Sequence, residues 1–151
     1  MGRIGNHNIE NDIAYANTCV NNNFWEIEKG LIALRTIHNA TNKLVNHNGK
    51  VLNDVLGDKD VLRTYVLATF VELAEFIQVL PWKPWRESVS GINSEKLLDE
   101  FADILAFIGV LITILNNIGF TPYNIADAYI KKERINIERF KIEHEKGARN
   151  E

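Results

Sequence analysis

Cysteine, proline and methionine are scarce in this chain of 151 residues, which contains one cysteine, three prolines and one methionine. The single cysteine, Cys19, cannot form a disulfide within the chain and cannot build a cysteine-based metal site. We therefore expect a reducing compartment, the cytoplasm. The small size of the chain suggests the cytoplasm of a bacterium or of a phage-infected host cell. Residues 1–15 contain no apolar core, so we expect no secretory signal there.

An excess of positive charge is also absent, because 17 Lys and Arg stand against 20 Asp and Glu, for a net charge of −3. Duplex nucleic acid is bound by basic surfaces, so we expect no nucleic-acid partner. The most apolar span, residues 104–115, is about half as long as a membrane helix of roughly 20 residues, so we expect no membrane partner. The 46% hydrophobic and 25% charged residues suit one globular domain over residues 1–151.

Apolar residues recur at helical spacing, and no run alternates as a half-buried strand does. The spacing predicts an all-α bundle of four to five helices, with a loose arm or short helix over residues 1–22 and a frayed tail over 144–151. The main helices are expected over 24–45, 58–80, 94–117 and 122–143, with a turn at 46–50. Asp58, Ser94 and Thr121 are the expected N-caps. Because residues 104–115 are apolar almost all round, we expect them to be buried near the interface of a tightly packed homodimer.

Two pairs of acidic residues stand inside strongly apolar segments. Glu72 and Glu75 are three residues apart, as are Glu100 and Asp103, so each pair shares one helix face. Converging buried carboxylates repel one another unless a divalent cation neutralises them. Oxygen ligands without nearby Cys or His suit Mg²⁺ or Mn²⁺. The spacing therefore predicts a two-helix acidic metal site, and the alternative is a pair of solvated helix faces.

The last predicted helix carries a polar stripe. Lys132, Asn136 and Arg139 follow one another at i, i+4 and i+7, and Tyr129 stands three residues before them. Taken alone, the stripe is best interpreted as a solvated basic face paired with glutamates of the same helix. Opposite a magnesium cluster it becomes a polyphosphate clamp, since Lys offers a point charge and Arg a bidentate fork.

The ExxE pair, 24 intervening residues and the ExxD pair resemble the all-α nucleoside triphosphate pyrophosphatase superfamily, which includes the MazG-like enzymes and the dimeric dUTPases. Three further features are most similar to the dimeric dUTPase branch. They are the Trp-Lys-x-Trp connector (Trp82, Lys83, Trp85), the KxxxNxxR stripe after a Tyr, and the segment 38–42 in the first main helix. The resemblance covers roughly residues 31–140.

The resemblance implies a homodimeric enzyme that hydrolyses dUTP to dUMP and pyrophosphate. It implies two or three Mg²⁺ ions per site, with Mn²⁺ as a substitute, held by Glu72, Glu75, Glu100 and Asp103. Glu75 is the expected general base. The expected phosphate ligands are Lys83, Tyr129, Lys132, Asn136 and Arg139, and the expected nucleobase ligands are His38, Asn42, Trp85 and Phe107.

Two departures from the branch bear on uracil specificity. Ala106 precedes Phe107 where many dimeric dUTPases carry His, and Thr36 and His38 stand where a Gln is expected. The same chemistry on another nucleotide, such as dCTP or a purine triphosphate, therefore stays open. His38 also fits a surface position, and Phe107 and Trp85 also fit the core. A third reading is a non-catalytic helical dimerisation or binding module, which has no need of four carboxylates in apolar helices.

Overall fold

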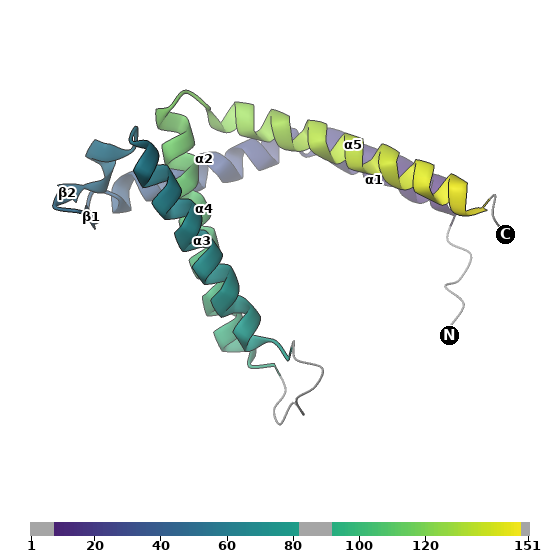
Figure 1. Ribbon diagram of the computed structural model, residues 1–151. Helices are drawn as coiled ribbons and strands as arrows, with labels where there is room; N and C mark the ends of the chain where they lie inside the picture. The colour runs from purple at the N-terminus through teal and green to yellow at the C-terminus, as the bar shows by residue number, and fades with distance from the viewer. Residues whose placement is uncertain (1–7, 82–91, 149–151) are drawn as a thin grey trace. The chain divides into compact units, whose positions relative to one another are not determined.

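The computed structural model describes residues 8–81 and 92–148, and in these ranges the chain is all-α except for one small hairpin (Figure 1). The elements are α1 (Ile9–Asn22), α2 (Phe24–Thr41), β1 (Asn46–His47), β2 (Lys50–Val51), a short 3₁₀ helix (Leu52–Val55), α3 (Lys59–Val79), α4 (Ser94–Asn117) and α5 (Pro122–Ala148). The predicted fold class is confirmed. The chain divides into two compact units, Met1–Gly30 with Pro122–Glu151, and Leu31–Thr121.

In the first unit, α1 lies alongside α5 (Figure 1). The Arg134 guanidinium donates two hydrogen bonds to Asn21 Oδ1, at 2.7 Å from Nη2 and 3.1 Å from Nε. Residues 1–22 were predicted as a loose arm or a short helix, and the part of them that the structure describes forms a helix of 14 residues after the N-cap Asn8.

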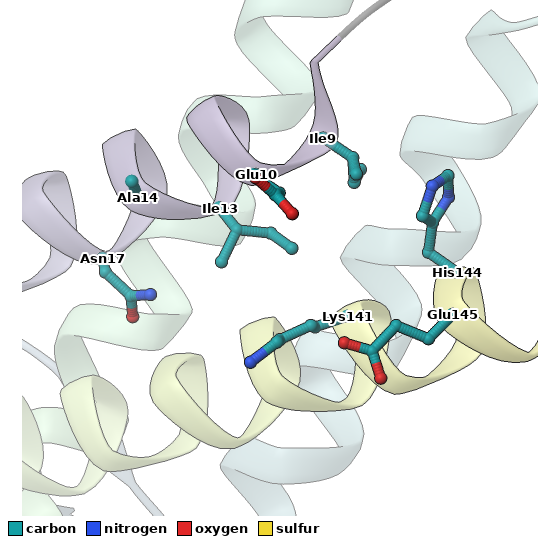
Figure 2. A pocket seen from close by; sticks show the side chains of 8 residues that line it. All are labelled: Ile9, Glu10, Ile13, Ala14, Asn17, Lys141, His144 and Glu145. Atoms are coloured by element: carbon teal, nitrogen blue, oxygen red, sulfur yellow. The ribbon is translucent and has the colours of Figure 1, made fainter.

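Helix α5 extends to Ala148, beyond its predicted end at Glu143, so the prediction of a frayed tail from residue 144 is wrong for residues 144–148. The reason is packing against α1. The last turns of α5 and the first turns of α1 line a pocket of about 590 Å³ (Figure 2). Its lining residues are Ile9, Glu10, Ile13, Ala14, Asn17, Lys141, His144 and Glu145.

In the second unit, α3 and α4 pack against each other along their lengths (Figure 1). A ring contact joins Phe76, late in α3, to Phe101, early in α4, and Val61, early in α3, shares a core cluster with Ile114, late in α4, so the two helices run antiparallel. The core of this unit lies at the other end of the pair, where the 3₁₀ helix and the start of α3 meet the end of α4. It contains Leu52, Leu56, Val61, Val110 and Ile114.

The segment predicted as a turn at 46–50 is a tight antiparallel hairpin, with Asn46 paired to Val51 and His47 to Lys50. The two connecting residues, Asn48 and Gly49, have φ values of 50° and 82°. Positive φ at both central residues is typical of a type I′ turn, for which Asn-Gly is the favoured sequence. The sequence pattern had not predicted these short strands.

Of the predicted helix caps, Asp58 is confirmed, Ser94 is corrected, and Thr121 stays a prediction. Asp58 caps α3 as predicted, its carboxylate accepting a hydrogen bond of 2.8 Å from the Asp60 backbone N–H. The cap of α4 is Asn93, not Ser94, because Asn93 Oδ1 accepts from the Lys96 backbone N–H at 3.1 Å and Ser94 is the first helical residue. Both residue types are good N-caps, and the backbone decides which of the two neighbours takes the role.

The apolar span 104–115 is largely covered within the chain, since Ile104, Ile112 and Ile114 are at most 5% exposed. Apolar side chains are left exposed on both α3 and α4, including Leu98, Phe101 and Leu105 of α4. One row of them on α3 consists of Val66, Phe70, Leu73 and Ile77, which are 38%, 64%, 45% and 41% exposed. In the described part of the chain, no single helix combines the length and hydropathy needed to cross a membrane, although α4 and α5 taken together as a broken pair meet that test.

Candidate active site

Three carboxylates converge where α3 meets α4. One carboxylate oxygen from each of Glu72, Glu100 and Asp103 can be chosen so that all three lie within 4.8 Å of one another. Glu72 and Glu100 are half-buried and Asp103 is exposed. We call this group the acidic cluster. It brings together side chains from two helices that the sequence separates by 27 residues, and oxygen atoms at this spacing can share a divalent cation.

Glu75 lies one turn beyond Glu72 and is exposed, and it is not part of the acidic cluster. Its charge still reaches the cluster. Burial raises the pKa of Glu72 above its ordinary value, and repulsion from Glu75, Asp103 and Glu100 raises the pKa further. The fold therefore holds Glu72 in a place that disfavours its charged form, and a bound cation would reverse that preference.

Aromatic pairs stand on both sides of the acidic cluster. On the side of the α3 C-terminus, the ring centroids of Phe76 and Phe101 are 6.0 Å apart. On the other side, those of Tyr65 and Phe107 are 6.1 Å apart. Sequence reasoning named Phe107 but missed Tyr65. The signal was available, because Tyr65 precedes Glu72 by seven residues and so shares its helix face.

His38, one of the expected base ligands, projects from α2 onto α4. Its imidazole occupies the space that a side chain at Gly109 would fill, since a Cβ built there would lie 2.0 Å from His38 Cδ2. Thr41 Oγ1 lies 3.5 Å from His38 Nδ1. Partial burial lowers the pKa of His38, so the neutral imidazole is favoured. Gly109 is therefore a second residue that sequence reasoning missed.

Asn42, another expected base ligand, is 1% exposed and sits just after α2. Its Nδ2 donates a hydrogen bond of 3.0 Å to Thr113 Oγ1, which in turn donates one of 2.7 Å to the Val110 carbonyl. Among residues 8–81 and 92–148, the buried Asn42 Oδ1 atom has no hydrogen-bond partner. A second link, from Arg35 Nη1 to Asn116 Oδ1 at 3.0 Å, joins the same helices. The two links fix the side of α2 that carries His38.

The expected phosphate ligands of α5 lie in the other compact unit. Tyr129, Lys132 and Arg139 are exposed, and Asn136 is half-buried and donates a hydrogen bond of 3.2 Å to Glu133. Arg139 Nε lies 3.8 Å from a carboxylate oxygen of Glu143, and its guanidinium lies 5.1 Å from the ring centroid of Phe140. Exposed ion pairs of this kind are weak, so these cations can be recruited by a phosphate.

The connector residues Trp82, Lys83 and Trp85 lie outside the described residues. The expected site is therefore seen in three parts. Three of the four expected metal ligands form the acidic cluster and the fourth, Glu75, lies beside it; two of the expected base ligands stand on the α2 side, and Phe107 pairs with Tyr65.

A protein-family model described as dUTPase matches residues 31–114 of the chain. The matched range is more than half of the 151 residues and contains both acidic pairs together with His38, Asn42 and Phe107. It ends before the stripe on α5. No curated protein and no solved structure gives a significant match to the chain.

Proposed function

The chain belongs to the dUTPase family, and from this membership we propose the metal dependence and the residue roles given below. It is a dUTP diphosphatase, a nucleoside triphosphate pyrophosphohydrolase that converts dUTP and water to dUMP and pyrophosphate. Its substrate is a nucleotide, and its family is generally dependent on divalent metals. The observation that carries the proposed metal site is the acidic cluster of Glu72, Glu100 and Asp103.

We assign two or three Mg²⁺ ions to Glu72, Glu75, Glu100 and Asp103. The donor set fits a hard cation, because it contains only carboxylate oxygens. Burial, and then repulsion from the neighbouring carboxylates, raises the pKa of Glu72, and a bound cation would offset both effects. Bound Mg²⁺ supplies charge neutralisation for the triphosphate and lowers the pKa of a bound water. Mn²⁺ has the same ligand preference and substitutes for it.

Glu75 is the proposed general base. It is exposed and has two carboxylate oxygens, so one oxygen can contact a cation while the other takes a proton from the attacking water. That water forms a bond to the α-phosphorus as the bond between this phosphorus and the bridging oxygen breaks. The bridging oxygen leaves with pyrophosphate.

Lys132, Asn136 and Arg139 are the proposed phosphate ligands of α5, together with Tyr129 and Lys83. What supports them is their donor chemistry, with Lys and Arg providing charge and Asn and Tyr neutral donors. The only contacts that Asn136 and Arg139 make with acids within the described residues are to Glu133 and Glu143, on the surface of their own helix. A triphosphate competes well against such exchangeable contacts.

His38, Asn42, Trp85 and Phe107 are the proposed base ligands. The neutral imidazole of His38 has one donor and one acceptor nitrogen, which suits an edge of uracil with carbonyl and N–H groups. The Asn42 carbonyl oxygen lacks a partner and is an acceptor for an N–H group. Phe107 offers an apolar ring face.

We also propose a homodimer of one-domain subunits (residues 1–151) that works in the cytoplasm without nucleic-acid or membrane partners. The exposed apolar side chains Val66, Phe70, Leu73 and Ile77 of α3 are spaced by four, three and four residues. This is the spacing with which one helix packs against another in a coiled coil. The net charge of −3 supports the expectation of no nucleic-acid partner, and the single cysteine supports the cytoplasmic location.

The test is pyrophosphate release from dUTP, dCTP, dTTP, dATP and dGTP, each with Mg²⁺ and with EDTA. We expect pyrophosphate release only from dUTP, and only when Mg²⁺ is present. We expect Glu75→Gln to abolish turnover, while Glu95→Gln, which changes an exposed carboxylate elsewhere on α4, keeps the parent rate. Full activity in EDTA would overturn the metal site, and parent-like turnover by Glu75→Gln would overturn the base assignment. Pyrophosphate release from dCTP or a purine nucleotide but not from dUTP would overturn the assignment of dUTP as the substrate.

A further inference from the structure

Tyr65 occupies the middle of a row of three rings. Its ring centroid is 6.0 Å from that of His47 in the β-hairpin and 6.1 Å from that of Phe107 in α4. The corresponding interplanar angles are 34° and 38°. All three residues are half-buried, so each ring has a part that faces solvent. The row therefore forms an accessible aromatic wall.

The wall is in register with the acidic cluster. Tyr65 precedes Glu72 by seven residues, and Phe107 follows Glu100 by seven, so each ring shares a helix face with a cluster carboxylate. Seven helical residues rise about 10.5 Å, and because α3 and α4 are antiparallel the two displacements run in the same direction. A nucleotide whose phosphates lie at the cluster would therefore extend along this surface with its base near Tyr65.

The residues of α3 that stand between Tyr65 and Glu72 on this face are small. Ala68 is three residues after Tyr65 and four before Glu72, and Thr69 is four after Tyr65 and three before Glu72. Small side chains at these positions suit a sugar between the base and the phosphates. At the other end of the cluster, Phe76 and Phe101 provide rings without any polar atom, so a base bound there would gain no hydrogen bond from them.

Tyr65 combines its ring with a free polar group. No hydrogen bond to its hydroxyl is formed among the described residues 8–81 and 92–148. Burial raises the pKa of the phenol, so the hydroxyl stays protonated and can both donate and accept. A pyrimidine presents π faces to a ring and carbonyl and N–H groups to a hydroxyl.

We propose that Tyr65 is a base-contacting residue of this enzyme, which packs its ring against the uracil and hydrogen-bonds the edge of the base through its hydroxyl. The neighbouring rings of His47 and Phe107 help to hold the Tyr65 ring in place. The inference rests on the proposed function for the position of the phosphates. It adds Tyr65 to the proposed base ligands and places the base on the side of the acidic cluster nearer the start of α3.

The test uses Tyr65→Phe and Tyr65→Leu with dUTP. Tyr65→Phe keeps the ring and removes the hydroxyl, and we expect it to raise KM about 2- to 12-fold, the range of one net hydrogen bond. Tyr65→Leu also removes the ring face, and we expect it to raise KM further, by roughly 5- to 150-fold, the range of one base stack. We expect kcat to change little in both variants, because the contact is present in the ground state and in the transition state alike.

Inorganic tripolyphosphate has no base and is the control ligand for phosphate binding. Its inhibition constant should be the same in the parent and in the Tyr65 variants. Phe76→Leu is the matched protein control, because it truncates one ring of the pair on the opposite side of the cluster. An unchanged KM in both Tyr65 variants would overturn the proposal, as would an equal rise in Phe76→Leu or in the tripolyphosphate constant. Affinity for a non-hydrolysable dUTP analogue is measured in parallel, so that the Tyr65 contact is judged even if the parent shows no turnover and the proposed function fails.

Discussion

The contact between His38 and Gly109 makes the substitution Gly109→Ala a sensitive probe of how α2 packs on α4. A Cβ at position 109 would lie 2.0 Å from His38 Cδ2, 2.4 Å from Nε2 and 2.9 Å from Cγ. Because Cγ is included, turning the ring about its own axis does not relieve the clash, and the whole imidazole has to move. Ordinary carbon contacts are about 3.5–4.0 Å, so the movement required is roughly 1.5 Å or more.

Two opposing effects set the magnitude. Adding a methylene-sized group to a packed contact costs about 1–3 kcal/mol. Replacing Gly by Ala inside a helix returns about 1 kcal/mol of helix propensity. We therefore expect Gly109→Ala to lower the free energy of unfolding by about 0–2 kcal/mol.

Gly30→Ala is the matched control, because Gly30 is also inside a helix but a Cβ there would meet nothing within 4 Å. It should raise the free energy of unfolding by about 1 kcal/mol. Urea denaturation of the two variants should therefore differ by about 1–3 kcal/mol, with Gly109→Ala the less stable.

The NMR titration of His38 gives a second readout. Burial lowers the pKa of His38 in the parent, so displacement of the ring into water should bring the pKa back up toward its ordinary value. If Gly109→Ala were as stabilising as Gly30→Ala and left the His38 pKa unchanged, the packing of His38 on α4 described here would be refuted.

Two further predictions concern the acidic cluster and the dimer. The pKa of Glu72 is higher in the folded chain than in the unfolded chain, so the folded state binds this proton more tightly. Without metal, the free energy of unfolding should therefore rise as the pH falls from above the raised pKa toward the ordinary pKa. Added Mg²⁺ should remove this rise. Thermal melts between about pH 4 and 8, with Mg²⁺ and with EDTA, measure it. If the two pH profiles coincided, metal binding by the acidic cluster would be contradicted. Phe70→Glu places a charge in the exposed apolar stripe of α3, and we expect this variant to sediment as a monomer. The control is Phe140→Glu, a change at an exposed ring of α5, which should leave the dimer intact. A Phe70→Glu protein that sediments as a dimer would exclude this stripe from the interface.

The helices could be predicted well from the sequence because local physics determines them. Apolar spacing gave α3 and α4 nearly to the residue, and Asp58 caps α3 as expected. The i, i+3 spacing of each acidic pair follows from helix geometry alone. The cap of α4 went to Asn93 rather than Ser94, because two adjacent residues had suitable side chains and local sequence does not choose between them.

The register between helices could not be predicted in the same way. It decides that Glu72, rather than Glu75, joins the α4 carboxylates, and that Tyr65 meets Phe107. The fit of His38 to Gly109 likewise depends on the approach of α2 to α4, which no single-helix pattern encodes. Residues 104–115 were expected to be buried near the interface with a second subunit, which stays a prediction; the structure shows that many of them are already buried within the chain and that exposed apolar side chains stand on both α3 and α4.

The central claim is that carboxylates of α3 and α4 hold the divalent ion needed for dUTP hydrolysis. The most direct measurement is anomalous diffraction from crystals grown with Mn²⁺ and a non-hydrolysable dUTP analogue. We predict a manganese peak bound by oxygens of Glu72, Glu100 and Asp103, at about 2.0–2.2 Å as expected for small divalent cations with oxygen ligands. Manganese bound elsewhere, with the three carboxylates free of metal in an enzyme that turns over dUTP, would contradict the claim.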